Sequence, residues 1–208
     1  MSVPGRIEAA ALLLSLDPPT WFLRHSRAVA EVAGWLAMRI VATGTALDRR
    51  LVEAAALLHD VDKLLPADDP ASALPHGEGS AAWLARQGFA ELGRAVAAHP
   101  ATRLLDEGGH HSPSALARRE ERVVAYADKR VGQRLESMDE RFASWLRRYP
   151  LVENSLEEGG WGPKTLRLVR VRADRLEAEV CHAAGTRPEE IRRLAWTGPA
   201  LRAAAARR

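Results

Sequence analysis

The sequence has very little cysteine and no long apolar run. Its single cysteine, Cys181, cannot form an intramolecular disulfide or a cysteine-based zinc cluster, and this scarcity fits a reducing compartment. No apolar run approaches the roughly 20 residues that a membrane-spanning helix requires. The stretch 9–16 is apolar, but Glu8 precedes it and Asp17-Pro18-Pro19 follows where a signal peptide would have small residues. These absences predict a cytoplasmic protein without a membrane partner.

The sequence also lacks a large excess of charge of one sign. Lysine and arginine together number 30 against 27 acidic residues in 208, so the net charge is only +3. Nucleic-acid-binding proteins typically have a dense, one-sided basic surface. The small surplus therefore argues against a nucleic-acid partner and is compatible with a small anionic substrate. Apolar residues at 47% exclude a wholly disordered chain.

Strand-like alternation is nearly absent, with 166–171 as its one short example, and Ala and Leu favour helices. The sequence therefore predicts an all-α fold. The expected helices are a short first one over 9–16, then 20–41, 48–58, two short ones before His99, 114–135, one ending near 149, 164–184 and one from 186 onward. Glycine and proline concentrate in 150–163, which predicts a linker between a main domain, 1–150, and a C-terminal helical hairpin, 151–208.

Several polar side chains lie on helix faces that are otherwise apolar. His25, for example, shares one stripe of its helix with apolar residues from Ala28 to Ile40. The inward-facing residues are His25, His59, Asp60, His99 and Asp128. A single inward histidine is more often a hydrogen-bonded core residue than a ligand, but five such groups require a shared partner, because a buried carboxylate is costly alone. Imidazole and carboxylate ligands without cysteine suit a divalent ion such as Zn, Fe, Mn or Co.

The order of these residues resembles the HD superfamily of metal-dependent phosphohydrolases. The motifs that carry the resemblance are His25, the central Leu57-Leu58-His59-Asp60-Val61-Asp62-Lys63, the closing Ala127-Asp128-Lys129, and the segments 76–81 and 96–99, which contain His76 and His99. Within the superfamily, the chain is most similar to the bacterial symmetrical bis(5'-nucleosyl)-tetraphosphatase group. The resemblance covers about 20–135. Two departures are Asp62, where a small residue is common, and the short spacing from Asp60 to His76.

The resemblance implies an all-α HD-domain bundle, a ligand set and a reaction. The first of one or two divalent ions would be held by His25, His59, Asp60 and Asp128. The second would be held by His76 and His99, with Asp60 as the bridging catalytic carboxylate. The choice among Fe, Mn, Co, Zn and Mg stays open. Metal binding lowers the pKa of water from about 15.7 toward ~7, so the resulting hydroxide would attack phosphorus.

Cationic residues next to the implied ligands in sequence are candidates for phosphate contacts. They are Arg24, Lys63, Lys129 and Arg130, and Lys63 is also a candidate catalytic residue. Lys63 could equally be a solvated loop lysine, whereas for Arg24 an ordinary surface ion pair is the commoner role, and Lys129 and Arg130 have the same ambiguity. Together they favour a small phosphorylated substrate, a dinucleoside polyphosphate before a nucleoside monophosphate, and a homodimer is compatible with the sequence. His110 and His111 lie in a glycine-flanked loop that could close over a substrate, although a solvated loop is the commoner role.

Other functions stay open. The six-ligand pattern also resembles diiron HD oxygenases, which use O2. A regulatory HD module with little turnover is a further alternative, although none of the four ligands of a one-metal site is missing. A nucleic-acid adaptor built on the arginine-rich C-terminus is disfavoured by interspersed acidic residues such as Asp174 and Glu177. No GYP motif follows the core, so cyclic-di-GMP hydrolysis is not expected.

Overall fold

The computed structural model describes residues 2–105, 118–148 and 162–207. This part of the chain is helical, without a β-strand, and contains one isolated bridge between Val131 and Leu135. The all-α prediction is confirmed. The helices are α1 (Arg6–Ser15), α2 (Thr20–Ala42), α3 (Arg49–Leu58), α4 (Glu78–Arg86), α5 (Gly93–Ala97), α6 (Arg119–Lys129), α7 (Met138–Arg148), α8 (Pro163–Ala183) and α9 (Thr197–Ala205), with short 3-10 turns between them.

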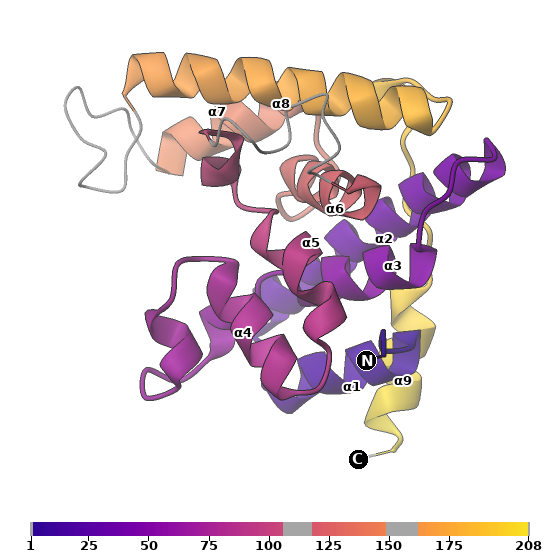
Figure 1. Cartoon of the computed structure of the whole chain (residues 1–208), viewed down its shortest axis with the longest axis vertical. Helices are drawn as coiled ribbons and strands as arrows, with labels where there is room; N and C mark the ends of the chain where they lie inside the picture. The colour runs from indigo at the N-terminus through magenta and orange to yellow at the C-terminus, as the bar shows by residue number, and fades with distance from the viewer. Residues whose placement is uncertain (1, 106–117, 149–161, 208) are drawn as a thin grey trace.

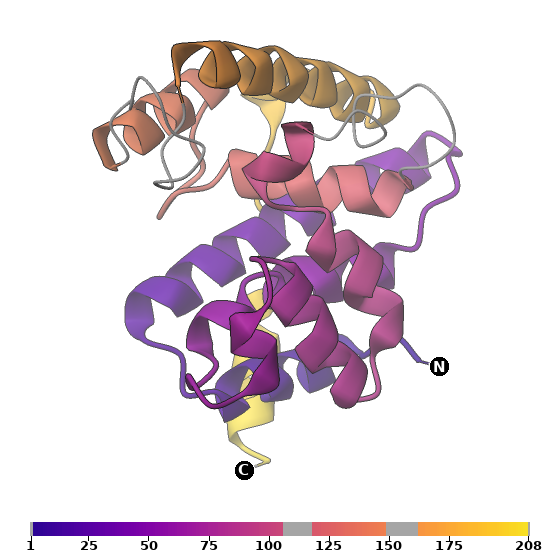
Figure 2. The same cartoon turned by 60° about the vertical axis from the view of Figure 1, so that its left-hand side comes forward.

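The long helix α2 and the apolar helix α3 form the centre of the molecule. The run Ala54–Leu58 is buried on all sides, as its continuous apolar sequence predicts. Helix α6 packs on α2, α3 and α5, and Figures 1 and 2 show it above the α2–α3 pair. Polar residues at the inner ends of these helices are therefore enclosed by the core.

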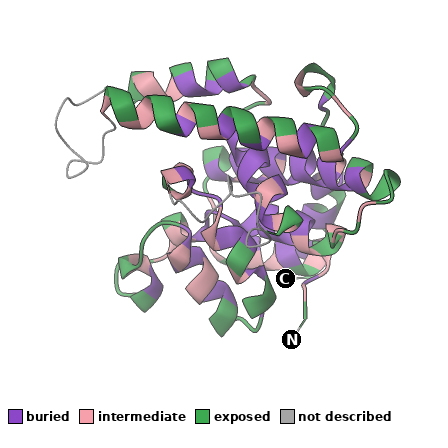
Figure 3. Ribbon diagram, turned by 45° about the horizontal axis from the view of Figure 1, so that its top comes forward, coloured by how far each residue is buried: buried purple, intermediate pink, exposed green. Residues whose placement is uncertain are grey.

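Helices α7 and α8 cover the face of the molecule beyond α6 (Figure 1). Arg170 of α8 binds Asp139 of α7 at 2.6 Å and lies over the Phe142 ring at 5.1 Å. The outward side of α8 is largely exposed and its inward side is buried (Figure 3). Among the described helices, none combines the length and apolar character that crossing a membrane requires.

The C-terminal segment differs from the expected hairpin. Helix α9 packs on α1, at the end of the molecule away from α8 (Figure 1). The helix expected from Thr186 is a single turn, Pro188–Glu190, and residues 191–196 then run along α2 without helical structure. Leu194 N donates to Glu31 O at 2.9 Å, and the Trp196 indole donates to Ala30 O at 3.1 Å. These tertiary hydrogen bonds hold the segment against α2 and override the local capping pattern.

The helix expected over 114–135 is also shorter, because α6 ends at Lys129. The chain then turns back on itself, with the Val131–Leu135 bridge closing the turn. This turn brings the Gly132 carbonyl against α2, where it contacts the site described below. Residues 106–117, which include His110 and His111, and the predicted domain boundary near 150 lie outside the described residues.

Candidate metal centre

Three core helices bring one set of potential ligands together, which we call the inner group: His25, His59 and Asp128. His25 lies on α2, His59 follows α3 directly, and Asp128 is in the last turn of α6. His25 Nε2 lies 3.3 Å from His59 Nε2 and 3.4 Å from Asp128 Oδ1, which is 3.6 Å from His59 Nε2. All three residues are buried. The inner group is therefore set by helix packing.

A second set, the outer group, consists of His76 and His99. Their Nε2 atoms lie 3.1 Å apart; His99 is buried, whereas the His76 side chain is 39% exposed. His76 precedes α4 in a tight turn, in which Gly77 has a φ of +84° and a Cβ would come within 2.9 Å of Pro100 Cγ. The left-handed conformation favours glycine. The position of His76 thus depends on this turn.

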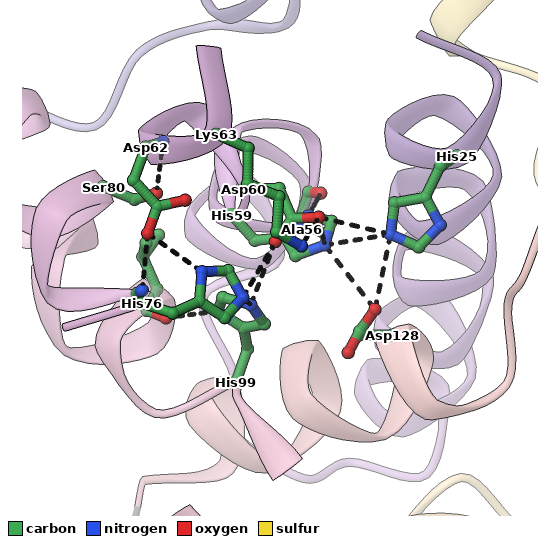
Figure 4. A network of polar contacts seen from close by, with 12 residues as sticks. His25, Ala56, His59, Asp60, Asp62, Lys63, His76, Ser80, His99 and Asp128 are labelled. Atoms are coloured by element: carbon green, nitrogen blue, oxygen red, sulfur yellow. Dashed lines mark hydrogen bonds and ion pairs between the residues drawn. The ribbon is translucent and has the colours of Figure 1, made fainter. Parts of the chain in front are cut away.

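Asp60 lies between the two groups and faces both (Figure 4). Its Oδ2 is 3.6 Å from His25 Nε2 and 3.5 Å from His59 Nε2. Its Oδ1 is 3.3 Å from the Nε2 atoms of His76 and His99. Oδ1 is buried and has no hydrogen-bond partner among the described residues. One carboxylate thus presents each oxygen to a different pair of imidazoles.

The four imidazoles share one orientation: Nδ1 contacts a protein oxygen and Nε2 faces the centre. The Nδ1 acceptors are Gly132 O for His25 at 2.8 Å, Ala56 O for His59 at 2.9 Å, Val96 O for His99 at 2.6 Å and Asp62 Oδ2 for His76 at 2.9 Å. Each acceptor favours the tautomer that is protonated on Nδ1 and leaves the Nε2 lone pair free. This arrangement is typical of histidines that bind metals through Nε2.

The electrostatics keep the carboxylates ionised despite their burial. Burial raises the pKa of the Asp60 carboxyl, but the neighbouring imidazoles of His59, His76 and His99 hold that pKa well below its usual range. Burial lowers the pKa of His99 to about 4. For His76, the nearby carboxylate of Asp60 and the hydrogen bond to Asp62 outweigh burial, and the pKa rises to about 9. The centre thus combines charged carboxylates with an imidazole, His99, held neutral at pH 7.

The residues fit divalent metal ions. Three overlapping triplets have ligand atoms within 4.8 Å of one another: His25, His59 and Asp128; His59, Asp60 and His99; and Asp60, Asp62 and His76. The donors are imidazole nitrogens and carboxylate oxygens, which suit borderline to hard ions. Imidazole Nε2 atoms that face each other at 3.1–3.3 Å also need a proton or a cation between them. The structure thus brings together all six residues that the sequence proposes as ligands and provides a His/Asp cluster that could hold metal.

Two of the four predicted phosphate contacts lie at the site. Lys63 Nζ binds Asp60 Oδ2 at 2.7 Å while 45% of its side chain is exposed. Arg24, one residue before His25, is exposed and lines the cavity described below. Both residues line that cavity, so both are available to an anion bound in it.

The prediction is wrong for the other two phosphate contacts, Lys129 and Arg130. Both are buried and neither lines the cavity. Lys129 is fully buried and donates to the carbonyl oxygens of His99 and Ala125 at 2.8 and 3.2 Å. Arg130 is also buried and binds the Tyr126 hydroxyl at 2.6 Å and Glu177 at 3.1 Å. Residues that follow Asp128 on a helix turn about 100° per residue away from it, so closeness in sequence does not place them at the ligands.

Two contributing residues were not among the predicted site residues. Asp62 accepts from His76 Nδ1 and, at 2.7 Å, from the Gly77 backbone N–H, so it orients the outer group. The sequence carried a signal for Asp62, because this aspartate stands where the motif commonly has a small residue. Arg141 of α7 is buried and places Nη2 3.9 Å from Asp128 Oδ1. No sequence pattern linked Arg141 to the centre.

A cavity of about 500 Å³ opens over the centre. Its lining includes His25 and Asp60 from the centre, together with Trp21, Gln133, Glu136 and Ser144. Five cationic side chains also line it: Arg24, Lys63, Arg134, Arg141 and Arg148. The volume falls in the range of small-molecule sites. The excess of cations favours an anionic ligand.

Fold and site together define an all-α bundle with a histidine–carboxylate cluster that could hold metal. The chain belongs to the HD domain family, whose pattern matches residues 22–131. The predicted superfamily is therefore confirmed. HD domains bind divalent metals and mostly belong to metal-dependent hydrolases.

Two curated relatives are each called Ribonuclease Y. The one from Chlorobium phaeovibrioides (strain DSM 265 / 1930) is 38% identical over 129 residues, and the one from Chlorobium luteolum (strain DSM 273 / BCRC 81028 / 2530) is 37% identical over 127. Each match covers 57% of this chain and only 22% of the relative. The chain therefore shares one region with these much longer proteins. No solved structure matches the chain significantly.

Proposed function

We propose that this protein is a metal-dependent phosphohydrolase that acts on a small nucleotide. The observation that carries the proposal is the position of Asp60, whose two carboxylate oxygens face separate groups of imidazoles. Such a carboxylate is suited to bridge two divalent ions. His25, His59 and Asp128 would complete one position, and His76 and His99 the other.

Divalent ions bound at these positions would activate water and polarise the phosphoryl group. The protein residues contribute orientation and charge. Asp60 fixes the relation between the two positions, while the Nδ1 contacts hold each imidazole in place. Lys63 neutralises part of the Asp60 charge and is exposed on its other side, so it can contact an incoming phosphate.

The cavity supports a nucleotide as the substrate class. Its five cations can neutralise more charge than a single phosphomonoester carries. Arg24, Arg134 and Arg148 take the place of the buried Lys129 and Arg130 in favouring a dinucleoside polyphosphate over a nucleoside monophosphate. Trp21, which is 56% exposed, also lines the cavity and offers a surface on which a base can stack.

The name of the two curated relatives favours a second candidate, hydrolysis of an RNA phosphodiester. The chemistry at the metal centre would be similar. The two candidates differ in the length of nucleic acid that must be bound. With a net charge of only +3, the protein as a whole attracts a long polyanion weakly. The cations that line the cavity are instead concentrated where a single nucleotide would bind.

A metal analysis followed by a substrate panel tests this proposal. The protein as purified, and after loading with Mn²⁺, would be assayed with diadenosine tetraphosphate, AMP and a labelled single-stranded RNA. Asp60→Asn would serve as the inactive control and the exposed Asp174→Asn on α8 as its matched variant. We expect metal-dependent hydrolysis of a nucleotide.

Cleavage of RNA alone would overturn the small-nucleotide proposal in favour of the second candidate. A metal-loaded protein that hydrolyses none of these substrates would overturn the phosphohydrolase. Bound iron with a mixed-valent EPR signal and consumption of O2 would instead identify an oxygenase.

A further inference from the structure

We propose that Arg141 of α7 binds the substrate phosphate beside the inner group. The inference rests on the proposed function and adds a recognition residue to it. Helix α7 begins at Met138, seven residues after the end of the HD family match at residue 131. The residue therefore belongs to a part of the chain that the family pattern does not cover.

The surroundings of Arg141 leave hydrogen-bonding capacity that a ligand can use. The residue is 7% exposed, and its Nε is buried without a hydrogen-bond partner among the described residues. Its Nη2 is 3.9 Å from Asp128 Oδ1, too far for a hydrogen bond. A guanidinium has five N–H donors, and burying a cation without satisfying them is costly. Because Arg141 also lines the cavity, a ligand in the cavity can satisfy them.

Packing holds the Arg141 guanidinium in position. Its central carbon lies 5.0 Å from the centre of the Trp145 ring, one turn further along α7. Trp145 in turn packs on Phe142 at 5.0 Å. The first turn of α7 is capped by Ser137, whose hydroxyl accepts from Glu140 N at 3.1 Å. The side chain is thus preorganised for an anion and loses little conformational entropy when it binds one.

The position relative to the metal centre identifies the anion as a phosphate held there. Lys63 contacts Asp60, and Arg141 is next to Asp128, so each of the two cations is near a different carboxylate of the centre. A phosphoryl group that approaches the inner group from the cavity meets both cations. The planar guanidinium matches two phosphate oxygens at once, which the point charge of Lys63 does not.

An alternative role is purely structural, in which Arg141 only balances the charge of Asp128. The two roles predict different measurements. A charge-balancing residue affects metal content and melting temperature, whereas a phosphate-binding residue affects anion affinity while the metal stays bound. The test therefore measures all three properties.

Inorganic phosphate is the probe, titrated calorimetrically into Mn²⁺-loaded wild type, Arg141→Gln and Arg141→Lys. Arg147→Gln is the matched control, because Arg147 is on the same helix, exposed and not part of the cavity lining. We expect Arg141→Gln to weaken phosphate binding roughly tenfold to hundredfold, as for a charged hydrogen bond, with metal content and melting temperature like those of the control. Arg141→Lys, which keeps the charge, should lose less.

An unchanged phosphate affinity in Arg141→Gln would overturn the inference, as would loss of metal in that variant. If Arg141→Gln does not fold, Arg141→Lys decides: a phosphate affinity equal to that of Arg147→Gln would overturn the inference, and weaker binding with full metal content would support it. Hydrolysis of diadenosine tetraphosphate or AMP by the wild type separates the two proposals. If the wild type hydrolyses either nucleotide and only the Arg141 prediction fails, the proposed function stands. A wild type that neither binds phosphate nor hydrolyses either nucleotide overturns both.

Discussion

The inner and outer groups of the centre differ in how the sequence fixes them. The inner group comes from three core helices, is buried throughout and directs its Nδ1 atoms to backbone carbonyls. The outer group depends on His76, which is 39% exposed, lies in a turn and is oriented by the side chain of Asp62. A ligand held by packed helices loses little freedom on binding a metal, whereas a ligand on an exposed turn loses more. We therefore expect tighter metal binding at the inner group.

The largest effect is expected when the residue shared by both groups is removed. Asp60→Ala deletes the only carboxylate among the described residues that faces all four imidazoles. We expect loss of both metals and of hydrolysis, with the helix content of the wild type. Metal analysis by mass spectrometry and far-UV circular dichroism check this, with Asp174→Ala as the matched control. Retention of full metal content would show that the two groups do not depend on Asp60.

Removing an outer ligand should separate the two groups. His99→Ala should lower the stoichiometry from two metals to about one per chain and reduce turnover severely, because the inner group stays complete. Equilibrium dialysis against Mn²⁺ measures the stoichiometry, and His182→Ala, an exposed histidine on α8, is the control. If the wild type binds a single ion at saturation, the outer group is not a metal position and the comparison fails.

Much of this centre could be predicted from the sequence, because its ligands lie on apolar faces. An inward His25 on α2 and an inward Asp128 on α6 must meet in a core built from those helices. The same reasoning failed for Lys129 and Arg130. They follow the proposed ligand Asp128 in sequence, but their side chains are buried in the protein and bind other groups. The role of Arg141 could not be predicted from the sequence, because the approach of α7 to Asp128 depends on tertiary packing.

The fold shows the same division between local and tertiary information. Continuous apolar periodicity predicted α2 and α3 correctly. The predicted C-terminal hairpin does not form, because residues 191–196 hydrogen-bond to α2 and α9 then packs on α1. A capping pattern at Thr186 indicates where a helix can begin, but it carries no information about these distant partners.

A smaller effect is expected from the residue that orients His76. Asp62→Ala removes the acceptor of His76 Nδ1 without deleting a ligand of the inner group. Loss of such a contact typically costs tenfold to hundredfold in metal affinity, and we expect about this loss for the outer ion alone. Competition with a fluorescent metal indicator measures both affinities, and Asp68→Ala, an exposed neighbour, is the control. Equal weakening of both ions would argue against separate groups.

The smallest effect concerns the stability that metal binding adds. An ion that binds only the folded chain, at a free concentration of 100 times its dissociation constant, stabilises it by about 2.7 kcal/mol. For a chain of this length that corresponds to a rise in Tm of roughly 5–10 °C. The inner ligands join α2, α3 and α6, which are distant in sequence and form the core, whereas the outer position lies at the edge. We therefore expect His99→Ala to keep most of the Tm difference between Mn²⁺-loaded and chelated protein, measured by differential scanning calorimetry. If that difference disappears in His99→Ala, the outer ion rather than the inner one links metal binding to the stability of the fold.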